Sequence, residues 1–221
     1  MTTTLPLFPL GTVLLPGTSL PLHVFEPRYR QLTVDLVTGK LPERNFGVLA
    51  IRQGWEVGPG NATALHDVGC EALLNDAKPL PDGRFDLATT GGRRFRLVEL
   101  DTESAPYLVG RVEWLEDTPT PAELTELTPL LEEGAVAAFR RYRAAAFEDN
   151  PTVAVNEALS YALANDCLLT PDDRQHLLEE RSEVRRLRMV RKMMHREAGI
   201  IAALHAVPAP IAELGHLPHR N

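Results

Sequence analysis

The sequence predicts an α+β fold, in which the first half of the chain builds a β-barrel and a C-terminal helical bundle follows. Up to about Asp117 the chain consists of short β-branched and aromatic runs separated by Pro and Gly, a pattern typical of many short strands. From Pro121 onward, apolar residues recur every three or four positions, as on the buried face of a helix. We therefore expect a barrel over residues 1–117, a helical subdomain over 118–206 and a proline-rich tail over 207–221.

The expected strands lie between turn signals such as Pro16-Gly17, Pro81-Asp82-Gly83 and Gly91-Gly92. They cover Leu5–Leu7, Thr12–Leu15, Ser19–Phe25, Phe46–Ile51, Leu65–Asn75, Arg84–Thr90, Arg93–Leu100 and Leu108–Leu115. One helix is expected to interrupt them. Pro27 suits its first position and Gly39 its end, while Tyr29, Leu32 and Leu36 fall on one face.

Helices are expected throughout the second half of the chain. The first runs from Pro121 to about Phe147, with a kink or boundary at Pro129. A second begins after Pro151-Thr152. A third starts at Thr170-Pro171, where two following acids complement the positive end of the helix. The last runs over Ser182–Leu204, and we expect the set to pack as a bundle against the barrel.

The amino-acid composition limits the binding partners and the cellular compartment that we expect for this protein. The net charge of −7 and the pI near 5.5 argue against a protein that mainly binds phosphate backbones, so nucleic acid is not the expected partner. Cys70 and Cys167 have no second Cys or His at metal-ligand spacing and are expected to be reduced apolar residues. No basic leader, cleavage site or long apolar run indicates secretion or a membrane span. We expect a soluble cytoplasmic protein.

Signatures of catalysis are missing from the sequence. The one Gly-Lys pair, Gly39-Lys40, is followed by Leu41-Pro42 and therefore cannot form a phosphate-binding Walker A loop. The four serines and three lysines show no recognisable Ser/Lys peptidase site. His23 and Glu26 are three residues apart in a strand that becomes a turn, so a shared metal is disfavoured against a partly buried histidine bonded to backbone. We expect no catalytic residue, metal or cofactor.

One basic run stands out near the C-terminus. It comprises Arg181, Arg185, Arg186, Arg188, Arg191, Lys192 and Arg196. We interpret it as the solvated or salt-bridged face of an amphipathic helix, with an RNA or acidic-partner surface as the alternative. A second candidate, Gly91-Gly92 followed by arginines, is either a tight hairpin turn or an anion-binding nest.

Taken together, these pieces resemble the Lon protease N-terminal, or LON substrate-binding, domain. The resemblance begins with LPLFPLGTVLLPGTSLPLHVFEPRYRQL (5–32) and continues through Val68-Gly69-Cys70, the 81–85 and 92–96 motifs, Pro106-Tyr107-Leu108 and the helical 173–179. It implies a PUA-like β-barrel followed by helices, and a role in engaging polypeptides before separate ATPase and peptidase domains act. It transfers no catalytic residue.

A polypeptide-binding site requires exposed apolar anchors with a few oriented polar groups. The candidates are Phe25, Tyr29 and Trp55 as anchors and Glu26, Arg28, Arg30 and Arg93 as charged partners, with core packing or internal ion pairs as the alternative for each. We therefore expect a non-catalytic module that binds an unfolded or specific polypeptide, in an adaptor role in proteolysis or quality control. RNA binding through the basic helix is the alternative; an ATP-independent hydrolase and a small-molecule pocket stay open. The sequence gives no oligomeric state.

Overall fold

The computed structural model describes residues 2–54, 62–147 and 159–204, which fall into two compact units. The first, which we call the strand unit, contains Met1–Thr118 together with Pro171–Arg181. The second, the helical unit, contains Pro119–Thr170 and Ser182–Asn221. The sequence assigned 171–181 to the helical subdomain, whereas the structure groups this segment with the strands. The expected tail over 207–221 lies outside the described residues.

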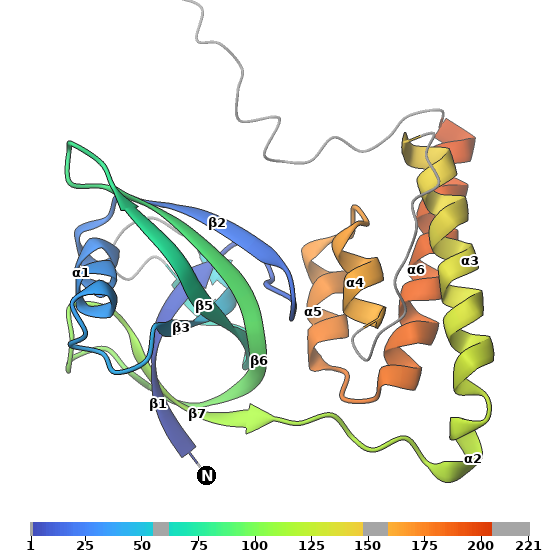
Figure 1. Cartoon of the computed structure of the whole chain (residues 1–221), viewed down its shortest axis with the longest axis horizontal. Helices are drawn as coiled ribbons and strands as arrows, with labels where there is room; N and C mark the ends of the chain where they lie inside the picture. The colour runs from blue at the N-terminus through green and yellow to red at the C-terminus, as the bar shows by residue number, and fades with distance from the viewer. Residues whose placement is uncertain (1, 55–61, 148–158, 205–221) are drawn as a thin grey trace, which may run out of the picture. The chain divides into compact units, whose positions relative to one another are not determined.

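The strand unit is built on a circuit of paired strands (Figure 1). The strands are β1 (Thr2–Leu10), β2 (Ser19–Val24), β3 (Asn45–Gly54), β4 (Ala62–Leu65), β5 (Val68–Pro79), β6 (Phe85–Asp101) and β7 (Val109–Leu115). Ladders join β1 to β7, β7 to β6, β6 to β5, β5 to β3, and β3 back to β1. The β1–β3 pairing is parallel and the other pairings are antiparallel, while β2 and β4 attach to one strand each. Together with the helices of the two units, this arrangement of strands confirms the α+β class.

Two of the expected strand boundaries are wrong. Thr12–Leu15 joins no ladder, although Val13, Leu14 and Leu15 are buried. Gly91-Gly92 is neither a hairpin turn nor an anion nest, because β6 continues through both glycines, with a shift in its register against β5 between Gly91 and Arg94. A Cβ atom on Gly91 would lie 2.1 Å from the Leu15 carbonyl oxygen. The glycine therefore permits close backbone approach inside a strand, a role that the sequence cannot distinguish from a turn.

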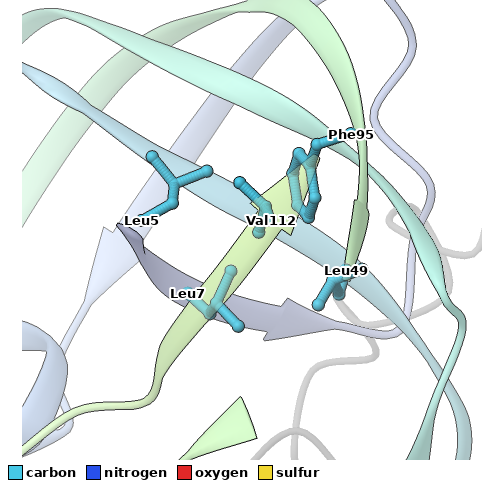
Figure 2. Close-up of a cluster of buried hydrophobic side chains, with 5 residues drawn as sticks. All are labelled: Leu5, Leu7, Leu49, Phe95 and Val112. Atoms are coloured by element: carbon cyan, nitrogen blue, oxygen red, sulfur yellow. The ribbon is translucent and has the colours of Figure 1, made fainter. Parts of the chain in front are cut away.

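The core of the strand unit lies inside the circuit. Figure 2 shows its central cluster, formed by Leu5, Leu7, Leu49, Phe95 and Val112. Phe95 is fully buried, and its ring meets the edge of the Trp114 ring with centroids 6.3 Å apart. The ring fits because position 69 on β5 has no side chain: a Cβ there would lie 2.6 Å from Phe95 Cζ. Close packing of this kind leaves no room for even one methyl group.

Helix α1 (Pro27–Val37) begins at the expected proline and buries the expected face of Tyr29, Leu32 and Leu36. Asp35, which is also buried, anchors it. The Asp35 carboxylate accepts hydrogen bonds from Gln31 Nε2 at 2.7 Å, Lys40 Nζ at 2.8 Å and Tyr107 Oη at 2.8 Å. Burial alone raises the pKa of Asp35, but these three donors together outweigh it and hold the pKa below its usual value. Burial and the bond to Asp35 raise the pKa of Tyr107 to about 12.

Arg94 of β6 fastens the late segment of the strand unit to the sheet. This side chain is almost fully buried. Its Nη1 donates to the carbonyl oxygens of Leu178 at 2.9 Å and Glu180 at 2.8 Å, at the end of α5 (Pro171–Glu179), and its Nη2 pairs with Asp117. A cation is favourable there because the last carbonyls of a helix are unpaired and carry negative partial charge.

The helical unit contains α2 (Ala122–Thr125), α3 (Thr128–Phe147), α4 (Leu159–Asn165) and α6 (Glu183–Leu204). Arg186, one of the basic run, is buried inside it. Its guanidinium bonds Glu183 Oε2 at 2.6 Å and Ser160 Oγ at 3.1 Å and lies over the Tyr161 ring. Ser160 is thus a structural group held by an ion pair. None of the described helices combines the length and the hydrophobicity that crossing a bilayer requires.

Replacing Arg94 with Leu should lower the free energy of unfolding by roughly 3 kcal/mol, because buried carbonyls and one carboxylate lose their partner. Urea titration measures the loss, and hydrogen exchange should show reduced protection of the α5 amides. The control is Arg111→Leu, which removes an exposed pair with Glu99 and should cost below about 1 kcal/mol. Equal losses in the two variants would show that Arg94 does not anchor α5.

The anchor at Asp35 predicts a pH dependence of stability. Because the pKa of Asp35 is lowered on folding, its contribution is present above its ordinary pKa near 3.8 and is lost as the pH falls through the lower folded value. Asp35→Asn should therefore be less stable than the wild type at neutral pH, and the difference should shrink as the pH falls below about 4. Thermal unfolding from pH 7 to pH 2 measures this, and a pH-independent difference contradicts it.

Candidate functional site

Strand β2 presents an unpaired edge. It forms a ladder with β6 from Ser19↔Thr90 to Val24↔Phe85, and no other described strand pairs with it. Its side chains alternate, with Val24 buried and Pro21 and His23 exposed. A strand edge without a partner offers a row of backbone donors and acceptors to another chain.

The register shows which backbone groups point away from β6. The Gly91 amide donates to the Thr18 carbonyl at 2.8 Å, which marks this as a hydrogen-bonded position. Such positions alternate along an antiparallel ladder. Leu20, Leu22 and Val24 therefore bond to β6, whereas Ser19, Pro21 and His23 direct their backbone polar groups to the open side. Proline fits there because the missing N–H costs no ladder bond.

An apolar hollow of about 210 Å³ adjoins this edge. It is lined by β2 and the start of α1, together with Phe8 and Leu10 of β1. Phe25 is half exposed on its rim. An exposed aromatic beside an apolar hollow and an open strand edge is an arrangement that can hold an extended polypeptide.

The joint between β2 and α1 builds one wall of the hollow. Glu26 precedes the helix in extended conformation, and its carbonyl accepts the amides of Tyr29 at 3.1 Å and Arg30 at 2.9 Å. The Glu26 carboxylate pairs with Arg28 Nη2 at 3.0 Å. Tyr29 stacks on Phe8, with ring centroids 3.9 Å apart. The joint is therefore rigid, because both backbone and side chains hold it.

Polar side chains flank the apolar wall. His23 Nδ1 lies 2.7 Å from Asp86 Oδ1, and His23 Nε2 lies 3.0 Å from Arg84 Nη1. Since an arginine nitrogen only donates, Nε2 accepts and the Nδ1–H donates to Asp86. The favoured sequence interpretation of His23, a partly buried histidine bonded to backbone, is wrong, because strand β6 supplies an exposed carboxylate opposite it.

The structure gathers some of the seven predicted site residues and separates others. Phe25, Glu26 and Tyr29 line the hollow. Tyr29 does so from a buried position, 2% exposed, so it is core as well as wall. Arg28 pairs with Glu26 beside them. Trp55 lies outside the described residues.

Arg30 and Arg93 are not among the residues that line the hollow. The Arg30 guanidinium lies against Gly83 in the turn between β5 and β6. Arg93 pairs with Glu71 at 3.1 Å and lies over the Trp114 ring at 3.7 Å. It is eight positions along β6 from Phe85, a separation of about 26 Å in an extended strand. Of the two sequence interpretations of Arg93, a binding residue or a member of an internal ion pair, the structure contains the ion pair, with Glu71.

Sequence reasoning left six residues of this surface out of the candidate set, namely Phe8, Leu10, Pro21, Leu22, His23 and Val24. The proline was a usable signal, because a proline inside a strand pattern indicates an edge strand. Phe8 and Leu10 of β1 gave no such signal in the sequence, because only the folded circuit of strands brings them next to β2.

Another hollow of the strand unit, about 440 Å³, is lined largely by polar groups, including Glu99, Asp101, Glu103 and Arg111. Thr4 of β1 and Glu99–Asp101 of β6 pair there with β7 alone, but the hollow has no aromatic anchor and few apolar groups, which makes it a poorer polypeptide site despite its size. Across residues 2–54, 62–147 and 159–204, no cluster of three His, Cys, Asp or Glu side chains is arranged to hold a metal ion.

Among curated proteins, the chain is similar to part of two Lon proteases. Lon protease 1 of Herpetosiphon aurantiacus is 27% identical over 201 residues, which cover 87% of this chain and 24% of that protein. Lon protease of Parabacteroides distasonis is 34% identical over 116 residues, covering 52% and 14% respectively. The chain thus spans about a quarter or less of the length of these relatives.

Solved structures agree on the fold. The Lon N-terminal domain protein from Xanthomonas campestris superposes with a TM-score of 0.55 at 28% identity, over 93% of this chain and 99% of that chain. The N-terminal domain of Mycobacterium avium complex Lon protease gives 0.60 at 16% identity, over 87% and 98%, and supports the fold alone. None of these relatives supports the RNA-binding alternative.

A family model extends over most of the sequence. Residues 4–196 match the domain described as the ATP-dependent protease La (LON) substrate-binding domain. That domain is the substrate-binding module of the protease and not its ATPase or peptidase part. The match confirms the resemblance seen in the sequence, and the chain belongs to the LON substrate-binding domain family.

Proposed function

We propose that this protein is a non-catalytic module that binds extended polypeptide segments at the open edge of β2. The observation that carries the proposal is the coincidence of three features on one surface: unpaired backbone groups at Pro21 and His23, an apolar hollow, and the half-exposed Phe25 on its rim. A bound segment would add a strand next to β2 and place an apolar side chain in the hollow.

Backbone pairing suits a module that meets many sequences. Main-chain hydrogen bonds supply affinity that does not depend on the side chains of the bound segment. The apolar hollow then favours segments with apolar side chains, which a folded protein would bury. The wall formed by Phe8, Tyr29 and the β2–α1 joint is already rigid, so little ordering cost falls on the protein when a segment binds. Among the predicted residues, we propose Phe25, Glu26, Arg28 and Tyr29 as this site and leave Arg30 and Arg93 to structural roles.

The named relatives are Lon proteases, of which this chain matches only a part. We therefore propose an adaptor role, in which the module holds an unfolded segment while separate proteolytic machinery acts on it. Binding should need no ATP, and the bound polypeptide should stay intact.

Replacing His23 with Pro tests the strand-addition mode. The substitution removes the outward N–H of residue 23 but no ladder bond to β6, so the fold should persist. The ligand is a labelled peptide in which apolar and hydroxyl residues alternate. Its affinity should fall about tenfold, which corresponds to roughly 1.4 kcal/mol. Fluorescence anisotropy measures the affinity, and circular dichroism checks the fold.

The matched control is His23→Ala, which removes the same imidazole but keeps the N–H and should retain most of the affinity. A peptide with prolines at alternate positions should bind weakly to the wild type, because it cannot pair as a strand. If the two variants lose affinity equally, or if the wild type binds neither peptide, β2 is not the docking edge.

A further inference from the structure

Helix α6 carries a basic stripe at an open hollow of about 330 Å³. The hollow is lined by Arg188, Arg191, Lys192 and His195, all exposed side chains of α6. Their spacing of three, four and seven residues places them on one face of the helix. Three members of the basic run, Arg188, Arg191 and Lys192, therefore line the hollow, and His195 joins them.

These four side chains differ from their basic neighbours. Arg186 is buried in a pair with Glu183, and Arg196 pairs with Glu197 at 2.6 Å. Within the ranges that the structure describes, none of the four forms an ion pair or hydrogen bond. Like charges three and four residues apart destabilise a helix, so the stripe has an electrostatic cost that no described carboxylate offsets.

The neighbouring helix leaves space over the stripe. Gly134 of α3 faces Arg191, and a Cβ atom there would lie 3.3 Å from Arg191 Nη1. A larger residue at this position would press on the guanidinium. The Arg191 guanidinium therefore lies against a position of α3 that carries no side chain.

We propose that this stripe is a docking site for an acidic polypeptide segment. The stripe extends over seven residues, about 10 Å of helix axis, which is longer than one carboxylate or phosphate group and matches a segment with several acidic side chains. A nucleic acid fits less well, because no Phe, Tyr or Trp lines the hollow as a platform for base stacking. This site is separate from the β2 edge and uses charge instead of backbone pairing.

The experiment uses the full chain and a labelled peptide in which Asp and Glu alternate with Ser and Gly. The wild type should bind the peptide at low ionic strength and lose it as salt is added. Arg191→Glu should weaken binding about tenfold, and a second reversal at Lys192 should weaken it further. Affinity for the apolar peptide of the previous section should not change, which separates the two sites.

The matched control is Arg140→Glu on α3, the same charge change on an exposed residue without a described ion pair. Arg140 is six residues, or about 240° of helical rotation, from Gly134 and therefore faces away from the stripe. It should keep wild-type affinity. Three outcomes each overturn the proposal: no binding by the wild type, equal loss in the control, or tighter binding of an RNA oligomer of the same charge.

Discussion

The buried guanidinium of Arg94 is the interaction on which the strand unit depends. A charge removed from water must be compensated locally, and Arg94 obtains its partners from Asp117 just after β7 and from the carbonyls of Leu178 and Glu180. These groups are far apart in sequence, so the guanidinium is satisfied only when the end of β7, the middle of β6 and the end of α5 are all in place. Nearby, the Thr118 amide donates to the Arg181 carbonyl at 2.8 Å, so the two points where the chain leaves the strand unit are themselves tied together.

The proposed binding surface combines a strand edge that is open with a wall that is rigid. Strand β2 bonds on one side to β6, and there Thr89 Oγ1 adds a bond to the Leu20 carbonyl at 2.7 Å. The other side is left to solvent, while Asp35 and Tyr107 hold α1 and thereby the wall. Rigidity on one side and unsatisfied backbone on the other are what a site for an incoming strand requires.

Sequence patterns predicted the elements more reliably than the partners of individual side chains. Pro27, the apolar face of α1 and the turn at Pro81-Asp82-Gly83 all act locally, which is why their roles could be read from spacing. Gly91 and Arg93 could not be read in this way, because a carbonyl from Leu15 and a carboxylate from Glu71 decide their roles. Likewise, α5 has the composition of any amphipathic helix, and its place in the strand unit depends on residues far earlier in the chain, among them Arg94 and the Val68 carbonyl that accepts from Gln175.

Because α5 belongs to the strand unit, this unit can be completed only late in the synthesis of the chain. Residues 119–170, which are the whole first stretch of the helical unit, emerge from the ribosome before the segment that completes the strand unit. At about 5–20 residues per second, the strands spend several seconds without α5, with the Arg94 guanidinium lacking its helix-end partners. During that interval the nascent chain exposes apolar surface of its own. The protein thus passes, while it is being made, through a state that resembles the unfolded segments it is proposed to bind.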